Sequence, residues 1–355
     1  MKSVAEIVDV SSREDPALRF IRRELAASPE RWIATLAFTG LAVIGVVATV
    51  TFRIPYPVLV FAAILLLTMR PAQRPFRQAV EATGAALLGA GFAVLLAITT
   101  NDQPWLYLPL QCVALTLLLV ISRVTAARPA FILAALVLSY AEPAYLPDPE
   151  EAIRAALFNA LALGGTAWAV ATAGTPFAPP ATCEDAPVPP GRRELARFAL
   201  LALTAIGLQM LFYNTIDLPE IRTGVISALL TADPDLRAVW QRMPLRLLCV
   251  ASCAATALLM TAVGAPLMDD LGLFAVLAGC CYFAPGWVAH GGPRIVFAAV
   301  PGVVAVTLVL LPDVRFAIDI VSSLLNVAGV LWGTFVTALI ALLLAPLLQQ
   351  DEPQS

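Results

Sequence analysis

The chain contains almost no lysine or histidine. Among its 355 residues, Lys2 is the only lysine and His290 is the only histidine. A nucleotide-binding P-loop needs a lysine at the phosphates, and a Schiff-base enzyme needs a buried lysine amine. A two-histidine zinc site and a Ser-His-Asp relay both need more than His290 alone supplies. We therefore predict no ATPase or other enzyme activity, and no metal or cofactor.

Charged residues of either sign are also scarce. They make up 13% of the chain, whereas 60% of the residues are hydrophobic. A soluble globular domain carries about 25% charged residues. Because a helix that crosses the bilayer core needs about 20 apolar residues, the composition predicts an all-α polytopic membrane protein of about twelve transmembrane helices. The expected surroundings are the lipid bilayer, and no nucleic-acid partner is expected.

The apolar runs form two groups of six, separated by a segment rich in proline. We expect this segment to be an exposed linker between two six-helix halves. The predicted organisation is a cytosolic N-terminal segment at 1–32, a first six-helix repeat at 33–173, a cytosolic linker at 174–196, a second repeat at 197–348 and a cytosolic tail at 349–355.

Two apolar runs, 57–69 and 223–232, are too short for an ordinary membrane span. At ~1.5 Å per residue they reach about 15 to 20 Å, against a hydrocarbon core of about 30 Å. Either they re-enter the membrane, or they cross it with polar ends buried against protein, and we favour crossing. Paired short segments of this kind are typical of transporter substrate paths. We expect a water-accessible passage where the two meet.

The surroundings of the two short runs resemble each other. Matching residues recur 163 to 166 residues later in three pairs: Pro55 and Pro219, Arg74 and Arg237, Arg31 and Arg197. This regular spacing predicts an internal duplication. Because six is an even number, both repeats insert in the same direction, as parallel repeats related by a pseudo-two-fold axis along the membrane normal.

The arginines favour one side of the predicted membrane. Cytoplasmic loops retain positive charge, and most of the arginines gather on one side when both termini are placed in the cytoplasm. Arg53, Arg154, Arg222 and Arg315 remain on the outer side. We therefore predict a multi-pass membrane protein with both termini cytoplasmic.

Five residues are candidates for binding a substrate. Gln209, Tyr213 and Asp217 lie four residues apart and form one polar stripe on the predicted seventh helix, and Arg53 and Arg222 flank the two short helices. Polar groups inside a membrane face the protein interior or a cavity, and guanidinium groups bind carboxylates bidentately. These five residues predict a site for an organic anion. The alternatives are that Asp217 lies among lipid headgroups, and that the arginines extend to the outer interface or pair with nearby carboxylates.

Glu81 is the candidate for proton coupling. It begins the predicted third helix, and a buried glutamate there could have a raised pKa and carry a proton. Alternatively, Glu81 pairs with Arg77 four residues earlier, or it is a first-turn acid that interacts favourably with the helix dipole.

Three successive segments around the first short helix carry a family resemblance: Leu65-Leu66-Leu67-Thr68, the following loop with Arg70, Pro71, Arg74 and Arg77, and the helix Thr83-Gly84-Ala85-Ala86-Leu87-Leu88-Gly89-Ala90-Gly91. They resemble the fusaric acid resistance or aromatic acid exporter superfamily of bacterial inner-membrane proteins, which implies the bacterial inner membrane as the location. The resemblance implies efflux of aromatic carboxylic acids or related toxic compounds, with a periplasmic adaptor and an outer-membrane channel as partners. The resemblance does not identify which residues of this chain bind the substrate.

The leading interpretation is therefore a secondary transporter that exports small organic anions, as part of a tripartite system or as a homo-oligomer. One alternative is a passive organic-anion channel lined by Arg53 and Arg222. Another is a membrane scaffold without transport activity. Flux that depends on the proton gradient would separate the exporter from the channel.

Overall fold

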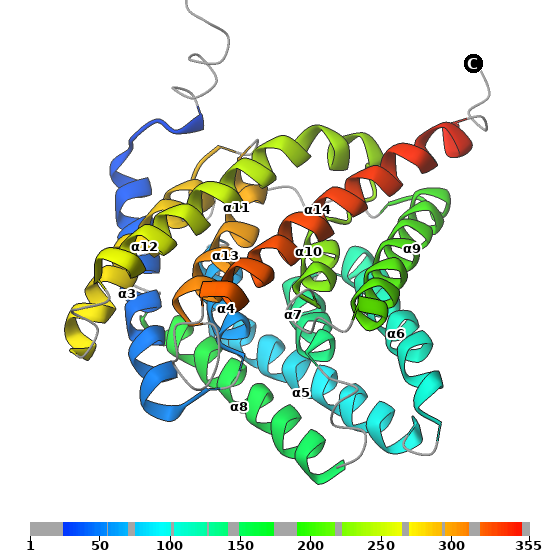
Figure 1. Cartoon of the computed structure of the whole chain (residues 1–355), viewed down its shortest axis with the longest axis horizontal. Helices are drawn as coiled ribbons and strands as arrows, with labels where there is room; N and C mark the ends of the chain where they lie inside the picture. Colours follow the sequence, from blue (N-terminus) through cyan, green and yellow to red (C-terminus); the bar gives the residue numbers. More distant parts are fainter. Residues whose placement is uncertain are drawn as a thin grey trace, which may run out of the picture.

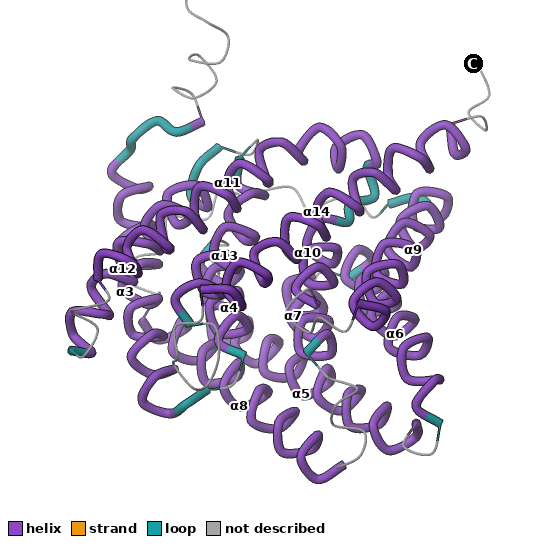
Figure 2. Tube along the Cα trace, viewed as in Figure 1, coloured by secondary structure: helices purple, strands orange, loops and turns teal. Residues whose placement is uncertain are grey.

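The structure is a computed structural model, and every secondary-structure element in its described part is a helix (Figure 2). The described residues are 24–54, 56–69, 75–100, 103–125, 128–140, 149–173, 190–216, 222–264, 270–292, 295–311 and 320–349. Most of the predicted linker at 174–196, most of the N-terminal segment and the tail lie outside these ranges. So does Asp217.

Eight helices are long and apolar enough to cross a membrane. They are α3 (Pro29–Phe52), α5 (Pro75–Thr100), α6 (Tyr107–Val124), α8 (Pro149–Ala173), α9 (Arg192–Ile216), α11 (Leu236–Gly264), α12 (Leu271–Ala289) and α14 (Ile320–Gln349). Only 33% to 50% of the apolar window of each is buried inside the protein. The outward faces are apolar as well, as expected where lipid rather than water surrounds a helix. The prediction of an all-helical, multi-pass membrane protein is confirmed.

Four further helices are short. They are α4 (Pro57–Thr68), α7 (Arg128–Ser139), α10 (Thr223–Thr231) and α13 (Ala299–Leu310). Prolines lie at several of their ends, because proline is favoured in the first turn of a helix and disfavoured in its interior. In the sequence, Pro57 opens α4, and Pro71, Pro234 and Pro312 follow α4, α10 and α13. The sequence predicted α4 and α10 as short, whereas α7 and α13 were counted among ordinary spans.

The short helices occupy the middle of the molecule, and the long helices surround them (Figure 1). Helix α4 contacts α7 and α13, and α10 contacts the same two helices. Ten of the twelve residues of α4, eight of the nine of α10 and all twelve of α13 are buried. The ends of these helices are therefore kept away from lipid, where unpaired backbone groups would be costly.

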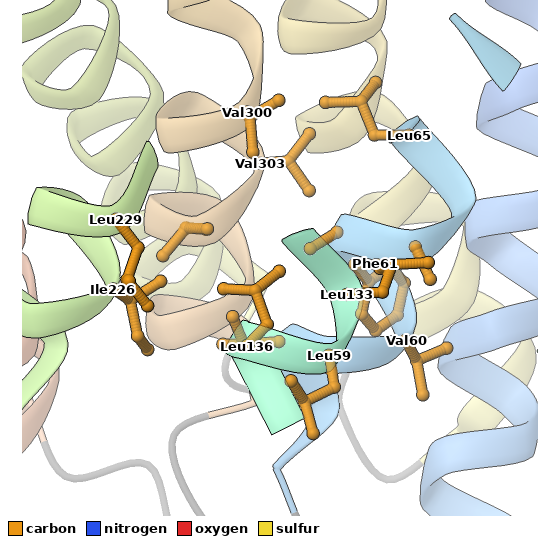
Figure 3. Packing of buried hydrophobic residues seen from close by; sticks show 14 of the residues in the cluster. Leu59, Val60, Phe61, Leu65, Leu133, Leu136, Ile226, Leu229, Val300 and Val303 are labelled. Atoms are coloured by element: carbon orange, nitrogen blue, oxygen red, sulfur yellow. The ribbon is translucent and has the colours of Figure 1, made fainter. Parts of the chain in front are cut away.

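The interface between the short helices is apolar. Leu59 of α4, Leu133 of α7, Ile226 of α10 and Val303 of α13 lie at this interface (Figure 3) and are almost fully buried. The Phe61 ring of α4 instead stacks on Tyr282 of α12 at 4.7 Å and lies against Gly45 of α3. The expected water-accessible passage is therefore closed at this level, because branched side chains fill the space where the four helices meet.

Helices α10 and α14 form a tight seam. The Thr223 hydroxyl donates to the Asn326 carbonyl at 2.7 Å, and the Ser227 hydroxyl donates to the Val330 carbonyl at 2.8 Å. A Cβ added at Gly333 would overlap the backbone of Gly224. Small residues and interhelical hydrogen bonds are the main sources of helix association in lipid. This seam fixes α10 against a long helix.

A similar close contact joins α5 to α7 and allows a matched stability test. A Cβ at Gly89 would overlap the carbonyl oxygen of Ala134, whereas a Cβ at Gly91 on the same helix meets nothing within 4 Å. We expect Gly89→Ala to destabilise the protein by about 1 to 3 kcal/mol through overpacking. Gly91→Ala should be neutral or slightly stabilising, because it removes a glycine from a helix interior.

The measurement is the thermal unfolding temperature of each purified variant in detergent, followed by tryptophan fluorescence. Equal unfolding temperatures for the two variants would contradict the close contact of α5 with α7.

Candidate functional site

The N-terminal ends of α4 and α10 meet around Arg222. The guanidinium carbon of Arg222 lies 5.5 Å from the centre of the Tyr56 ring and 5.8 Å from that of Tyr140. The two tyrosine rings lie 4.8 Å apart. We call Arg222, Tyr56 and Tyr140 the Arg222 cluster. Its members come from the starts of α10 and α4 and from the end of α7, so it combines one cation with two aromatic faces.

The turn between α3 and α4 places Tyr56 in this cluster. Arg53 and Tyr56 both adopt left-handed backbone conformations, with φ of 50° and 56°. Such a conformation costs of order 1 to 3 kcal/mol in a residue other than glycine, and it occurs often at functional sites. Pro57 then fixes the first residue of α4. The turn thereby reverses the chain and holds the Tyr56 ring against Tyr140.

The backbone adds positive potential to the same place. Neither α4 nor α10 has a side-chain hydrogen bond capping its N-terminus within the described residues. The first N–H groups of a helix lack intrahelical partners and carry the positive end of the helix dipole. Two such ends beside a guanidinium group make a favourable position for an anion.

Two buried polar groups at this end lack partners among the described residues. Gln209 of α9 is 2% exposed, and neither atom of its side-chain amide has a hydrogen-bond partner there. Its Oε1 lies against Gly224 in the first turn of α10. The Tyr140 hydroxyl, 4% exposed as a residue, is likewise unpaired. An unpaired buried polar group costs about 1 to 3 kcal/mol, so these groups are available to a polar ligand or to water.

Two of the five predicted binding residues lie at the start of α10: Arg222 precedes its first turn, and Gln209 lies against Gly224 within that turn. Tyr213 lies one turn beyond Gln209 on α9 and is half-buried. Arg53 is exposed at the end of α3, and no hydrogen bond, ion pair or ring contact between described residues joins it to the Arg222 cluster. Asp217 lies outside the described residues.

Glu81 forms an ion pair with Arg77. The Arg77 Nε and the Glu81 Oε1 are 2.8 Å apart, and the two side chains are 68% and 37% exposed. This is the i, i+4 pairing that the sequence offered as the alternative to proton coupling.

Sequence reasoning missed Tyr56 and Tyr140. One pattern could have indicated Tyr56, which lies between Pro55 and Pro57 directly before a short apolar run. Tyr140 ends the run that forms α7. The two are far apart in sequence, and only the packing of α4 against α7 brings their rings together.

Comparison with known proteins finds distant relatives. The chain is 28% identical over 171 residues to the multidrug resistance protein MdtO of Escherichia coli strain K12, and to the protein of the same name from Shigella flexneri. The aligned part covers 48% of this chain but only 25% of each relative, so the match spans about a quarter of their length. No protein-family model and no solved structure matches the chain. The chain is thus a multi-pass membrane protein that is similar, along 48% of its length, to part of MdtO.

Proposed function

We propose that this protein is a secondary transporter that exports small organic anions, in particular aromatic carboxylic acids or related toxic compounds. The observation that carries the proposal is the Arg222 cluster, in which a guanidinium group, two tyrosine rings and the N-termini of two helices meet inside a membrane protein. The names of the relatives, which refer to multidrug resistance, support export of toxic compounds.

The cluster suits the two parts of an aromatic carboxylate. The carboxylate group would bind the Arg222 guanidinium and the first N–H groups of α10, through charge-assisted hydrogen bonds. The ring would pack against the tilted aromatic pair that Tyr56 and Tyr140 form. The Gln209 amide, unpaired among the described residues, would bind a second polar substituent. Tyr213, Asp217 and Arg53 remain proposed members of the same site.

The proposed architecture is two parallel six-helix repeats, α3 to α8 and α9 to α14, with twelve spans in all. In each, the second and fifth helices are short: α4 and α7 in the first, α10 and α13 in the second. Helix contacts correspond as well, since α5 packs on α8 as α11 packs on α14, and α3 packs on α12 as α9 packs on α6. This correspondence supports a pseudo-two-fold axis along the membrane normal. The proposed location is the bacterial inner membrane with both termini cytoplasmic.

The apolar interface of the short helices favours a transporter over a channel. A channel needs a continuous polar path when open, whereas buried apolar residues such as Leu133 and Ile226 fill the centre here. An exporter needs only one end open at a time. Movement of one six-helix half against the other would open the two ends alternately. The proposed partners are a periplasmic adaptor and an outer-membrane channel, and a homo-oligomer is a further proposal.

Arg222 offers the main test. We expect Arg222→Ala to reduce proton-gradient-driven uptake of benzoate into inside-out membrane vesicles at least about tenfold, because the bidentate partner of the carboxylate is lost. Arg222→Lys should transport benzoate at a rate between those of Arg222→Ala and the unchanged protein. Lysine keeps the positive charge but lacks the planar guanidinium group that lies over the tyrosine rings. Arg154, an exposed arginine at the start of α8 that is predicted on the same side, is the matched control.

Arg154→Ala should transport like the unchanged protein. Equal transport by Arg222→Ala and Arg154→Ala would show that the Arg222 cluster does not take part in transport. Benzoate flux that a protonophore leaves unchanged would favour the passive channel, and absence of benzoate flux in the unchanged protein would favour the scaffold.

Glu81 remains the proposed proton-coupling residue. If it carries the proton, Glu81→Gln abolishes accumulation of benzoate against its gradient but preserves exchange of external for internal benzoate, because exchange needs no net proton movement. Arg77→Gln, which removes only the partner of the ion pair, should retain accumulation. Normal accumulation by Glu81→Gln would show that Glu81 serves only to pair with Arg77.

A further inference from the structure

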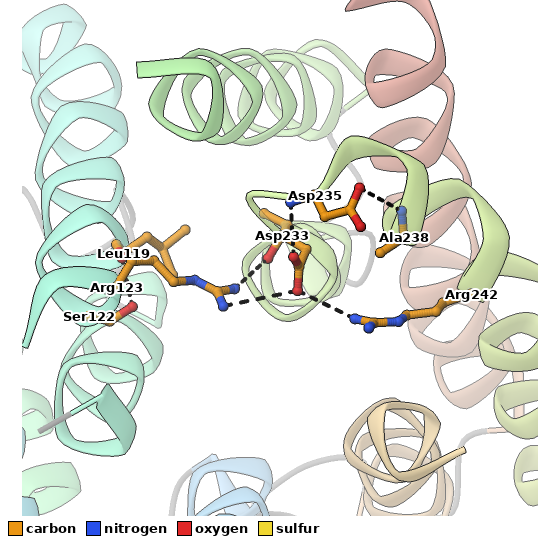
Figure 4. A network of polar contacts seen from close by, with 8 residues as sticks. Leu119, Ser122, Arg123, Asp233, Asp235, Ala238 and Arg242 are labelled. Carbon is orange, nitrogen blue, oxygen red and sulfur yellow. Dashed lines mark hydrogen bonds and ion pairs between the residues drawn. The ribbon is translucent and has the colours of Figure 1, made fainter. Parts of the chain in front are cut away.

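A second charged cluster lies at the other end of α10. Asp233, just beyond the C-terminus of α10, lies between Arg123 of α6 and Arg242 of α11 (Figure 4). Its Oδ2 is 3.4 Å from Nη1 of Arg242 and 4.0 Å from Nη1 of Arg123. Arg123 also donates to the carbonyl oxygen of Ala232 at 2.8 Å. A cation at this position interacts favourably with the C-terminal end of the helix.

Arg246 lies one turn from Arg242 on α11 and shares its aromatic neighbour. The guanidinium carbons of Arg242 and Arg246 are each 5.2 Å from the centre of the Phe297 ring. We call Arg123, Arg242, Arg246, Asp233 and Phe297 the Arg246 cluster. The sequence counted its arginines only as loop charges that set the topology, whereas α11 places Arg242 and Arg246 inside a helix.

Arg246 is buried without enough partners. It is 5% exposed, and its Nε and Nη1 have no hydrogen-bond partner among the described residues. The Nε of Arg123 is also buried and unpaired there. A buried charge requires a counter-charge and hydrogen bonds to offset its desolvation. Arg123 and Arg242 pair with Asp233, whereas no ion pair joins Arg246 to it. Among the described residues, the cluster therefore has more positive than negative charge, and Arg246 has unpaired donors.

The two clusters lie at opposite ends of one very short helix. Arg222 precedes α10 and Asp233 follows it, and nine helical residues at ~1.5 Å each separate them by about 14 Å. Ile226 and Leu229 of α10 lie between, in the apolar interface of the short helices. The arginine distribution assigns the Arg246 cluster to the cytoplasmic end.

We propose that the Arg246 cluster is the cytoplasmic loading site for the exported substrate, which binds as a small aromatic carboxylate. The carboxylate takes the free donors of Arg246, and Phe297 stacks on the substrate ring. Asp233 holds Arg123 and Arg242 in place when the site is empty and competes with the substrate for them. This inference rests on the proposed export function. It adds a second substrate site, separate from the Arg222 cluster.

Binding of benzoate to the purified full chain tests the proposal. The protein is placed in nanodiscs of phosphatidylcholine alone, and an Arg222→Ala background isolates the second site. We expect Arg246→Gln to weaken benzoate binding about 10- to 100-fold, as when a charge-assisted hydrogen bond is lost. Benzyl alcohol, which has the ring but no charge, should bind weakly to every variant.

Two further variants control for folding. Arg237 is exposed on the same helix, and Arg237→Gln should bind benzoate like its parent. Asp233→Asn should bind benzoate several-fold more tightly, because the competing carboxylate is gone. A purely structural cluster would not give this gain, so Asp233→Asn tests the proposal even if Arg246→Gln fails to fold.

The outcomes separate the inference from the proposed function. Equal benzoate binding by Arg246→Gln and Arg237→Gln, together with export that depends on Arg222, would overturn the loading site and leave the export function standing. Absence of benzoate binding and transport in the unchanged protein would overturn both. If Arg246→Gln changes only the binding of phosphatidylglycerol added to the nanodiscs, the cluster holds a lipid headgroup and the loading site is wrong.

Discussion

Backbone polarity in a bilayer is the constraint on which this structure depends. Four helices are shorter than a hydrocarbon core of about 30 Å, and their ends carry N–H and C=O groups that lipid cannot satisfy. The protein meets this constraint by placing α4, α7, α10 and α13 against one another and surrounding them with eight long helices. Glycine contacts and hydroxyl groups on α10 and α14 then hold the short helices close to their neighbours.

The same constraint accounts for where charge is tolerated. A helix that ends in the protein interior leaves polar backbone groups there, and charged residues lie at both such ends of α10. Arg222 and two tyrosine rings lie at its start, and Asp233 with three arginines lies near its end. Between them the interface of the short helices is apolar. Two polar ends and a thin apolar barrier form an arrangement that small movements could open on either side, as alternating access requires.

The spacing of polar residues along a helix predicted some of these contacts but not others. The i, i+4 stripe correctly indicated that Gln209 turns inward, because a polar residue at that depth must face protein. It could not indicate that the amide faces Gly224, since that contact depends on how α9 crosses α10. The spacing of Arg77 and Glu81 predicted their ion pair, because i, i+4 geometry is local. Arg242 and Arg246 have the same spacing, but their importance depends on Phe297 and Asp233 from other segments.

The sequence by itself determined that the chain is an all-helical membrane protein without a lysine-dependent or histidine-rich site, because composition and run length depend only on local transfer free energies. It also located two short helices, because the length of an apolar run is a local property of the sequence. Only the tertiary structure decided that four short helices share the centre, that Tyr56 and Tyr140 meet beside Arg222, and that Arg246 is buried beside Phe297. Those contacts join residues distant in the chain, and packing between helices, rather than any local preference, brings them together.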